Sequence, residues 1–302
     1  MMQITSIGEI LFDIYNNKQK KIGGAPFNFI YHIIKLTGEG NFISRIGKDP
    51  LGNEVLEFFR LNKISSDYLQ IDNIYFTGTA KPELNNEKIP VWNIKTETAY
   101  DFIELNKEID KLVDEKTGCI YFGTLAQRKI ISRKTIQSLF KKSKKYFYDL
   151  NIRQNFYSKE IVELSLKAAH VVKLNIDELI IIKDLFFEPS KISLSQDETA
   201  DILINKFKID LLCITMGGKG AALYKGNDSC CYQIDVKQND IVDTIGAGDA
   251  YAAILCIGYL KNWDIRKTNR LASEFAAEII KIQGAIPADD SLYNYFKKVI
   301  ND

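Results

Sequence analysis

Strand-like and helix-like segments alternate along most of this chain of 302 residues. Apolar runs that predict buried strands occur at 3–12, 41–46, 118–123, 145–150, 170–174, 210–215 and 221–225. Helical spacing is found at 26–37, 52–62, 132–143, 159–168, 176–183, 196–207, 246–261 and 267–282, the last two closing the chain. Such alternation is typical of a parallel sheet covered by helices on both faces. We therefore predict an α/β chain whose ligands bind at the carboxyl ends of the strands.

Two segments break this alternation. Residues Thr77–Glu83 and Ile89–Lys95 alternate polar and apolar side chains around the turn-like Leu84–Lys88, which predicts a β hairpin. Residues 14–21 are polar and hairpin-like, and they end close to Gly23 and Gly24. We predict a single domain, 1–302, with a small β layer inserted at 14–21 and 76–103.

Composition excludes several classes of protein. The 40 Lys and Arg residues balance 39 Asp and Glu residues, which argues against a nucleic-acid partner. No apolar run reaches the roughly 18 residues that indicate a membrane span. Glu9 and Asp13 interrupt the first apolar stretch, so that stretch predicts a strand and not a signal peptide. Five cysteines without metal-binding spacing predict reduced thiols in a cytoplasmic protein.

Histidine chemistry is also close to excluded. His32 lies in an apolar helical pattern and His170 follows two alanines, so both are interpreted as structural. Catalysis must then depend on carboxylates, backbone donors or a bound ion. No GxxxxGK[ST] or GxGxxG string is present, which argues against a P-loop kinase and a Rossmann dehydrogenase.

The string Asp243-Thr-Ile-Gly-Ala-Gly-Asp249 precedes a long apolar helix and is the strongest local signal. Its two glycines and one alanine leave backbone N–H groups bare at a helix start, where the helix dipole favours an anion. Asp249 in the first turn suits a base that accepts a proton from a hydroxyl attacking a phosphoryl group. The alternative is a glycine-rich loop in which Asp249 only stabilises the helix, and the length of the string favours the catalytic interpretation.

Four weaker motifs lie at other predicted strand ends and helix starts. Gly23-Gly24 and Asn28 open a helix close to Asp13, an arrangement that suits vicinal hydroxyls or is simply a capped turn. Asn175 and Glu178 fit either water-mediated Mg²⁺ binding or a capping box. The other two motifs are Asp149-Leu-Asn-Ile-Arg153 and Thr215-Met-Gly217-Gly218-Lys-Gly220, the second of which passes under a nucleotide or only forms a turn.

These motifs follow one another along the chain in the order seen in ribokinase-like (PfkB-type) carbohydrate kinases. The chain resembles that family from Gly8 to about Pro287. Within that family it is most similar to fructokinases, through the segments 8–13, 23–26, 99–101 and 122–128. The resemblance implies a three-layer α/β/α sandwich with a mostly parallel central sheet and a small β-sheet lid over the sugar. Ile245 and Tyr251 depart mildly from the family pattern, without loss of a functional group.

The resemblance also implies roles for individual residues. Asp249 would be the base, beside an anion hole formed by Gly246, Ala247 and Gly248. Substrate would contact Asp13, Gly24, Asn28, Tyr100 and Arg153. Nucleotide would contact Asn175, Thr215, Gly217, Gly218 and Gly220, and Asn175 and Glu178 would hold Mg²⁺ through water. A monovalent cation such as K⁺ would lie beside the anion hole, near Asp243, Ile245 and Gly284.

The implied reaction is transfer of the γ-phosphoryl group of ATP to a primary sugar hydroxyl, with fructose converted to fructose 6-phosphate. Alternative substrates are ribose, a nucleoside, a 2-keto-3-deoxy sugar acid or a sugar phosphate, and an anionic one would need additional cations. Lys21, Lys81, Lys95, Arg128 and Arg153 lie close to the sugar segments in sequence. A different-class alternative is a non-catalytic sugar- or nucleotide-binding regulator. The lid is also expected to form a homodimer contact, because isolated hairpins need cover.

Overall fold

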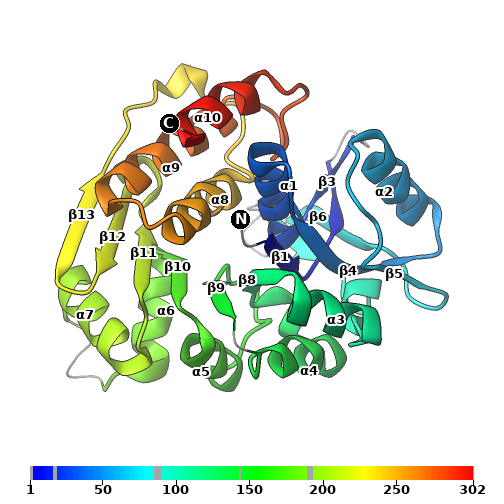
Figure 1. The fold of residues 1–302 in the computed structure, drawn as a ribbon, viewed down its shortest axis with the longest axis horizontal. Coiled ribbons are helices and arrows are strands. Elements are labelled where there is room, and N and C mark those ends of the chain that lie inside the picture. The colour runs from blue at the N-terminus through cyan, green and yellow to red at the C-terminus, as the bar shows by residue number, and fades with distance from the viewer. Residues whose placement is uncertain (1–2, 16–18, 85–89, 143, 189–192, 302) are drawn as a thin grey trace.

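The computed structural model describes residues 3–15, 19–84, 90–142, 144–188 and 193–301. Its central sheet has nine strands, which run through most of the molecule (Figure 1). Their order is β13 (Asp228–Tyr232), β12 (Ala221–Lys225), β11 (Leu211–Thr215), β10 (Val171–Asn175), β9 (Lys145–Asp149), β8 (Thr117–Gly123), β1 (Gln3–Ile7), β4 (Asn41–Gly47) and β5 (Leu69–Asp72). Neighbours from β11 to β5 pair in parallel, whereas β12 pairs antiparallel with both β11 and β13.

Helices cover both faces of this sheet, as the alternation predicts (Figure 1). One face packs against α1 (Ala25–Thr37), α8 (Ala247–Leu260), α9 (Ile265–Ile279) and α10 (Ser291–Asn301), with α2 (Pro50–Leu61) beside α1. The other face packs against α3 (Lys107–Glu115), α4 (Ile130–Leu139), α5 (Lys159–Ala168), α6 (Ile176–Phe186) and α7 (Gln196–Phe207). The three-layer α/β/α architecture is therefore confirmed.

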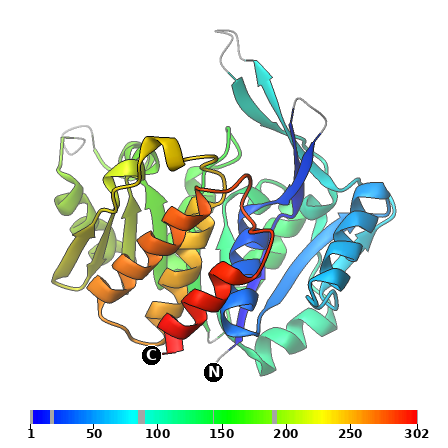
Figure 2. The same cartoon turned by 90° about the horizontal axis from the view of Figure 1, so that it is seen from above.

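A second sheet of four strands projects from one edge of the molecule (Figure 2). Its order is β3 (Lys20–Gly23), β2 (Leu11–Ile14), β6 (Gly78–Leu84) and β7 (Pro90–Ile94). The outer pairs are antiparallel and the central β2–β6 pair is parallel. The predicted hairpin is thus present as β6 and β7, while its turn at 85–88 and residues 16–18 lie outside the described residues.

The expected continuous strand over 3–12 is wrong. β1 ends at Ile7 in the central sheet, and β2 begins at Leu11 in the small sheet. The bend passes through Gly8, where a Cβ atom would lie 2.5 Å from Pro26 Cγ. The apolar run hid this break because Ile10, Leu11 and Phe12 are buried on the far side of the bend as well.

Four elements were absent from the sequence expectation: β5, β13, α3 and α10. The helix α10 follows α8 and α9, so the expectation that those two helices close the chain is wrong. Tyr293, Phe296 and Ile300 recur at helical spacing and are all buried, so α10 had a readable signal.

The structural interpretation of the histidines is supported by their contacts. His32 is fully buried beside the Tyr293 hydroxyl at 2.9 Å, and His170 Nδ1 accepts a hydrogen bond from the Tyr146 amide.

Phe29 gives a direct test of this packing. It is fully buried in α1, and its ring stacks on Tyr121 of β8 with centroids 3.8 Å apart. We expect Phe29→Ala to lower the free energy of unfolding by about 3–5 kcal/mol, because it removes buried surface and leaves a cavity. Leu61→Ala, at a side chain that is 64% exposed, should change it by less than about 0.5 kcal/mol. Chemical denaturation of both variants measures the difference, and equal effects would contradict the packing.

Candidate active site

A cavity of about 470 Å³ lies where the carboxyl ends of the central strands meet the small sheet. Asp149, Asn175 and Thr215 end β9, β10 and β11 and line this cavity, while Trp92 and Ile94 enter it from β7. The sequence-predicted site residues that share its wall are Asp13, Gly24, Asn28, Arg153, Asn175, Glu178, Thr215, Ile245, Gly246, Gly248 and Asp249. The structure thus brings together residues from both ends of the chain.

Asp249 lies in the first turn of α8, which begins after Gly246. Gly246 has a φ of 81°, and a Cβ atom there would clash with Ala285, so only glycine fits this turn. Asn28 in the first turn of α1 donates a hydrogen bond from Nδ2 to Asp249 Oδ2 at 2.7 Å. Burial raises the pKa of Asp249 to about 6, and the bond from Asn28 limits that rise. The carboxylate is therefore ionised at neutral pH but more basic than a free Asp.

Hydrogen-bond acceptors dominate the wall beside Asp249. Glu9 and Asn28 are buried, and Glu9 Oε2 and Asn28 Oδ1 have no partner among the described residues. Burial raises the pKa of Glu9 and of Asp13 to about 7. Gly24, with a φ of 107°, packs against the Glu9 carbonyl, where a Cβ atom would lie 2.6 Å from the oxygen. Such a wall favours a ligand that donates several hydrogen bonds, such as a polyol.

A buried ion pair was not predicted from the sequence. Lys173 of β10 donates to both carboxylate oxygens of Asp149, at 3.0 and 2.9 Å. Tyr121 also donates to Asp149, at 2.9 Å. Both members of the pair line the cavity. The motif Asp149–Arg153 and the pair Asn175 and Glu178 stand separately in the sequence, and neither shows that Lys173, two residues before Asn175, pairs with Asp149 across the sheet.

Asn175 and Glu178 form the capping box that was the structural alternative for this motif. Asn175 Oδ1 accepts from the Glu178 amide, Glu178 Oε2 accepts from the Asn175 amide, and Glu178 Oε1 accepts from the Ile152 amide. Among the described residues, no group of three His, Cys, Asp or Glu side chains is arranged to hold a metal. Both side chains still line the cavity, so they fit Mg²⁺ only through bound water and nucleotide oxygens.

Asp243 ties together the two segments beside the anion hole. Its carboxylate accepts from the Ile245 amide and the Gly284 amide, each at 3.0 Å. The predicted cation residues Asp243, Ile245 and Gly284 are therefore neighbours in space. Carboxylate oxygen is a ligand type that suits a hard monovalent cation, and Asp243 supplies it between these two segments.

The predicted nucleotide glycines form the turn between β11 and β12. Gly217–Lys219 is a short 3-10 helix, and Gly217 and Gly218 are exposed. Gly220 has a φ of 85°, and a Cβ atom there would clash with the Tyr232 carbonyl. Thr215, just before this turn, is the member of this motif that lines the cavity. The turn explanation therefore accounts for Gly220, while Gly217 and Gly218 are open to a ligand.

Tyr100 lies outside the cavity wall, so its expected contact with substrate stays a prediction. It is fully buried beneath the small sheet, and its ring packs under the Arg128 guanidinium. Arg128 in turn forms a bidentate pair with Asp101, at 2.7 and 2.8 Å. Neither Tyr100 nor Arg128 belongs to the described residues that line the cavity. Their motif supports the base of the small sheet.

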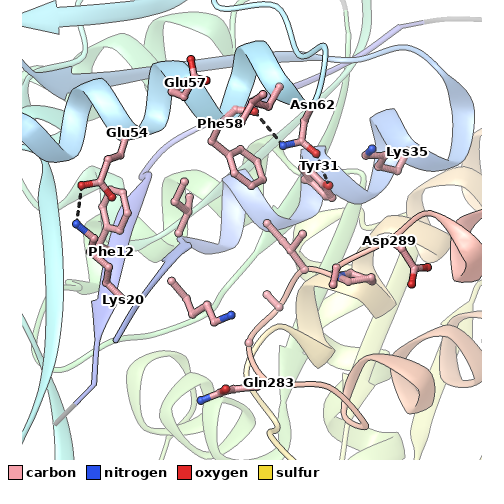
Figure 3. A pocket seen from close by; sticks show the side chains of 18 of the residues that line it. Phe12, Lys20, Tyr31, Lys35, Glu54, Glu57, Phe58, Asn62, Gln283 and Asp289 are labelled. Carbon is pink, nitrogen blue, oxygen red and sulfur yellow. Dashed lines mark hydrogen bonds and ion pairs between the residues drawn. The ribbon is translucent and has the colours of Figure 1, made fainter. Parts of the chain in front are cut away.

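A second, larger groove of about 770 Å³ lies behind β2 and β3 (Figure 3). Phe12, Tyr31 and Phe58 form its apolar wall, and the loop 283–290 closes it. Its charged side chains include two ion pairs, Lys20–Glu54 and Lys35–Asp290. Gly284 lines this groove and donates its backbone N–H to Asp243, so the same loop contacts the segment before α8.

Comparison with known proteins places the chain in a family. The model of the pfkB family of carbohydrate kinases matches residues 3–291. The sugar kinase PH1459 from Pyrococcus horikoshii, which is uncharacterized, is 27% identical over 97% of this chain and 95% of its own length. A fructokinase from Escherichia coli is 24% identical over 93% and 94%.

Solved structures agree with that placement. PH1459 in complex with ATP superimposes with a TM-score of 0.81 at 25% identity, over 98% of this chain and 99% of that one. A Vibrio cholerae fructokinase with bound fructose, ADP and potassium has a TM-score of 0.77 at 21% identity, over 98% of each chain. At this low identity, the likeness to the Vibrio cholerae structure shows only that the fold is shared.

No helix among the described residues is long and apolar enough to cross a membrane.

The match covers nearly the whole chain, and the cavity lies at the strand ends where this fold binds its ligands. The protein therefore belongs to the pfkB family of carbohydrate kinases.

Proposed function

We propose that this protein transfers the γ-phosphoryl group of ATP to the 6-hydroxyl of fructose. The observation that carries the proposal is the position of Asp249. Its carboxylate lies in the first turn of α8, one residue after the glycine-rich helix start, and is bonded to Asn28 on the acceptor-lined wall. One carboxylate thus borders both an anion site and a polyol site.

The proposed roles follow from this arrangement. Asp249 accepts the proton of the attacking hydroxyl, while the backbone N–H groups at Gly246, Ala247 and Gly248 stabilise charge on the phosphoryl group. Asp13, Gly24 and Asn28 hold sugar hydroxyls, and Arg153 contacts the transferred phosphate or the substrate. Positioning and charge stabilisation supply most of the catalysis in phosphoryl transfer.

Charge favours a neutral sugar over one that is already anionic. Among the described residues lining the cavity, the cations are Lys173 and Arg153, and Lys173 is already paired with Asp149. The other four candidates do not line it. Arg128 is paired with Asp101, Lys95 lies over the Phe76 ring, Lys81 is exposed, and Lys21 lines the second groove.

Two cations complete the proposal. Mg²⁺ would bind nucleotide phosphates and reach Asn175 and Glu178 through water, where it supplies positive charge. K⁺ would bind beside Asp243 with carbonyls of Ile245 and the Gly284 loop. Ribose, a nucleoside or a 2-keto-3-deoxy sugar acid stay alternative substrates. A sugar phosphate is disfavoured because few Lys or Arg side chains line the cavity. The intact pairing of Asp249 with Asn28 argues against a non-catalytic regulator.

The experiment that tests the function is a coupled ADP-release assay with Mg²⁺-ATP and a panel of sugars. We expect the highest kcat/KM with fructose, and phosphate attached at the 6-hydroxyl in the product. A higher value with a nucleoside or a sugar acid would replace fructose. No turnover with any sugar would contradict the kinase assignment.

Asp249→Asn should lower kcat by roughly 10²–10⁴-fold, the usual scale of general base catalysis. The amide keeps the size and the helix-start hydrogen bonding, so sugar binding, ATP binding and the melting temperature should change little. Steady-state kinetics and thermal unfolding of the same variant measure both. Near-normal turnover with a lowered melting temperature would show that Asp249 only stabilises the helix, an effect of about 0.3–1 kcal/mol.

Asp13→Ala should weaken sugar affinity much more than ATP affinity, because Asp13 belongs to the wall away from the nucleotide turn. A charge-assisted hydrogen bond contributes about 1.5–3 kcal/mol, so the KM for sugar should rise by at least tenfold. Thr215→Ala is the matched control at the other end of the cavity and should affect the KM for ATP instead. An unchanged sugar KM in Asp13→Ala would refute this assignment.

We further propose that the small sheet is a lid over the sugar and the contact of a homodimer in the cytoplasm. Phe76 and Ile74 beside it are 62% and 78% exposed, while Ile94 and Trp92 face the cavity side. The cysteines are free thiols, as a reducing compartment requires. Sedimentation at micromolar concentration should show a dimer that Phe76→Lys weakens. Only monomer, with sugar and nucleotide present, would refute the dimer.

A further inference from the structure

Lys173 is the residue of the cavity whose chemistry the motifs leave unexplained. It lies in the middle of β10, and its register partner on β9 is Asp149. The residue is only 7% exposed, yet it lines the cavity. A charged group in such a place is costly, and a buried ion pair adds little net stability compared with apolar packing. The fold alone therefore gives no reason for an ammonium group here.

The ammonium is held in place and remains charged. Its Nζ atom lies 3.0 and 2.9 Å from the two oxygens of Asp149. Burial acts to lower the pKa of Lys173, but the carboxylates of Asp149 and Glu178 outweigh it and leave that pKa above its ordinary value. Asp149 is the residue to which it donates among the described residues, and an ammonium has three N–H donors, so it can donate to a further acceptor.

The ammonium lies beside the glycine-rich start of α8. A Cβ atom built on Gly248 would be 3.3 Å from Lys173 Nζ, so the ammonium adjoins the first turn of α8. Asp249 follows in that same turn. Burial raises the pKa of Asp249, and the charge of Lys173 limits that rise. A single positive group thus lies close to both the anion site and the base.

The charge balance of the cavity adds a second reason. The described residues of its wall carry five carboxyl groups against two cations, and the pKa of two of them, Glu9 and Asp13, is raised to about 7. The other three are Asp149, Glu178 and Asp249. An ATP molecule brings further negative charge. Arg153, the other cation, is exposed, so Lys173 is the buried one.

We propose that Lys173 is a further catalytic residue, whose ammonium donates a hydrogen bond to the phosphoryl group during transfer and is positioned for this by Asp149. In the step, the sugar oxygen forms a bond to the γ-phosphorus while the bond from that phosphorus to the bridging oxygen of ADP breaks. The hydroxyl proton passes to Asp249, and the electron pair of the broken bond leaves with ADP. Lys173 keeps its proton throughout and supplies only charge and a hydrogen bond. This inference rests on the proposed kinase function.

The test begins with Lys173→Met, which keeps most of the length of the side chain and removes the charge. We expect kcat to fall by about 10²–10³-fold, the cost of removing one preorganised donor, while the KM for sugar stays near its wild-type value. Lys173→Arg keeps a positive charge and should retain more turnover than Lys173→Met. Lys145→Met is the matched control, because Lys145 on β9 also pairs with an aspartate, Asp210, but at the surface. It should leave kcat unchanged.

Lys173→Met leaves Asp149 buried without its partner, so the single variant can fail to fold. The double variant Lys173→Met with Asp149→Asn removes both charges and decides the question in that case. Its reference is Asp149→Asn alone, which keeps the ammonium and should turn over faster than the double variant. Folded variants without Lys173 that keep turnover within threefold of their references would overturn the proposal.

A second readout separates contact with the phosphoryl group from a structural role. ADP with aluminium fluoride and sugar mimics a phosphoryl group in transfer and should bind wild-type enzyme more tightly than ADP with sugar alone. By calorimetry, Lys173→Met should lose most of this tightening while ADP affinity stays the same. Full tightening in a slow variant would overturn the proposal. Wild-type turnover with a sugar is measured first, and its absence would refute the kinase function itself together with this inference.

Discussion

The hydrogen bond between Asn28 and Asp249 connects two helix starts that are 221 residues apart in the chain. Both helices begin at glycines whose backbone conformations exclude other residues, Gly24 before α1 and Gly246 before α8. Each helix then packs on the same face of the central sheet. This one contact joins the acceptor-lined wall to the glycine-rich start of α8, and both members line the cavity.

Charge divides the cavity into two regions with different chemistry. Glu9, Asp13 and Asn28 offer acceptors to hydroxyl groups, whereas the start of α8 offers backbone donors to an anion. Asp249 lies at the boundary, where burial raises its pKa to about 6, as the base of the proposed reaction requires. The same low-polarity surroundings make the unpaired acceptors costly in the free protein, so a ligand that donates hydrogen bonds to them gains affinity.

The sequence motifs could be read because their constraints are local. A glycine run before an apolar helix, with a carboxylate in its first turn, needs no knowledge of the fold, and the site around Asp249 followed from it. Lys173 could not be found this way, because its partner Asp149 is set by the register of β9 on β10. The split of β1 from β2 was hidden for a related reason, since both sides of the bend are buried. Tyr100 is buried in the core and does not line the cavity, a position that its motif alone does not reveal.

The position of a bound sugar is the most direct measurement of the central claim that Asp249 joins the polyol site to the phosphoryl site. A crystal structure with fructose and a non-hydrolysable ATP analogue would give it. The 6-hydroxyl oxygen should lie about 2.6–3.2 Å from the Asp249 carboxylate, with the terminal phosphate at the start of α8. A sugar bound elsewhere, or one that presents no hydroxyl to Asp249, would contradict the claim.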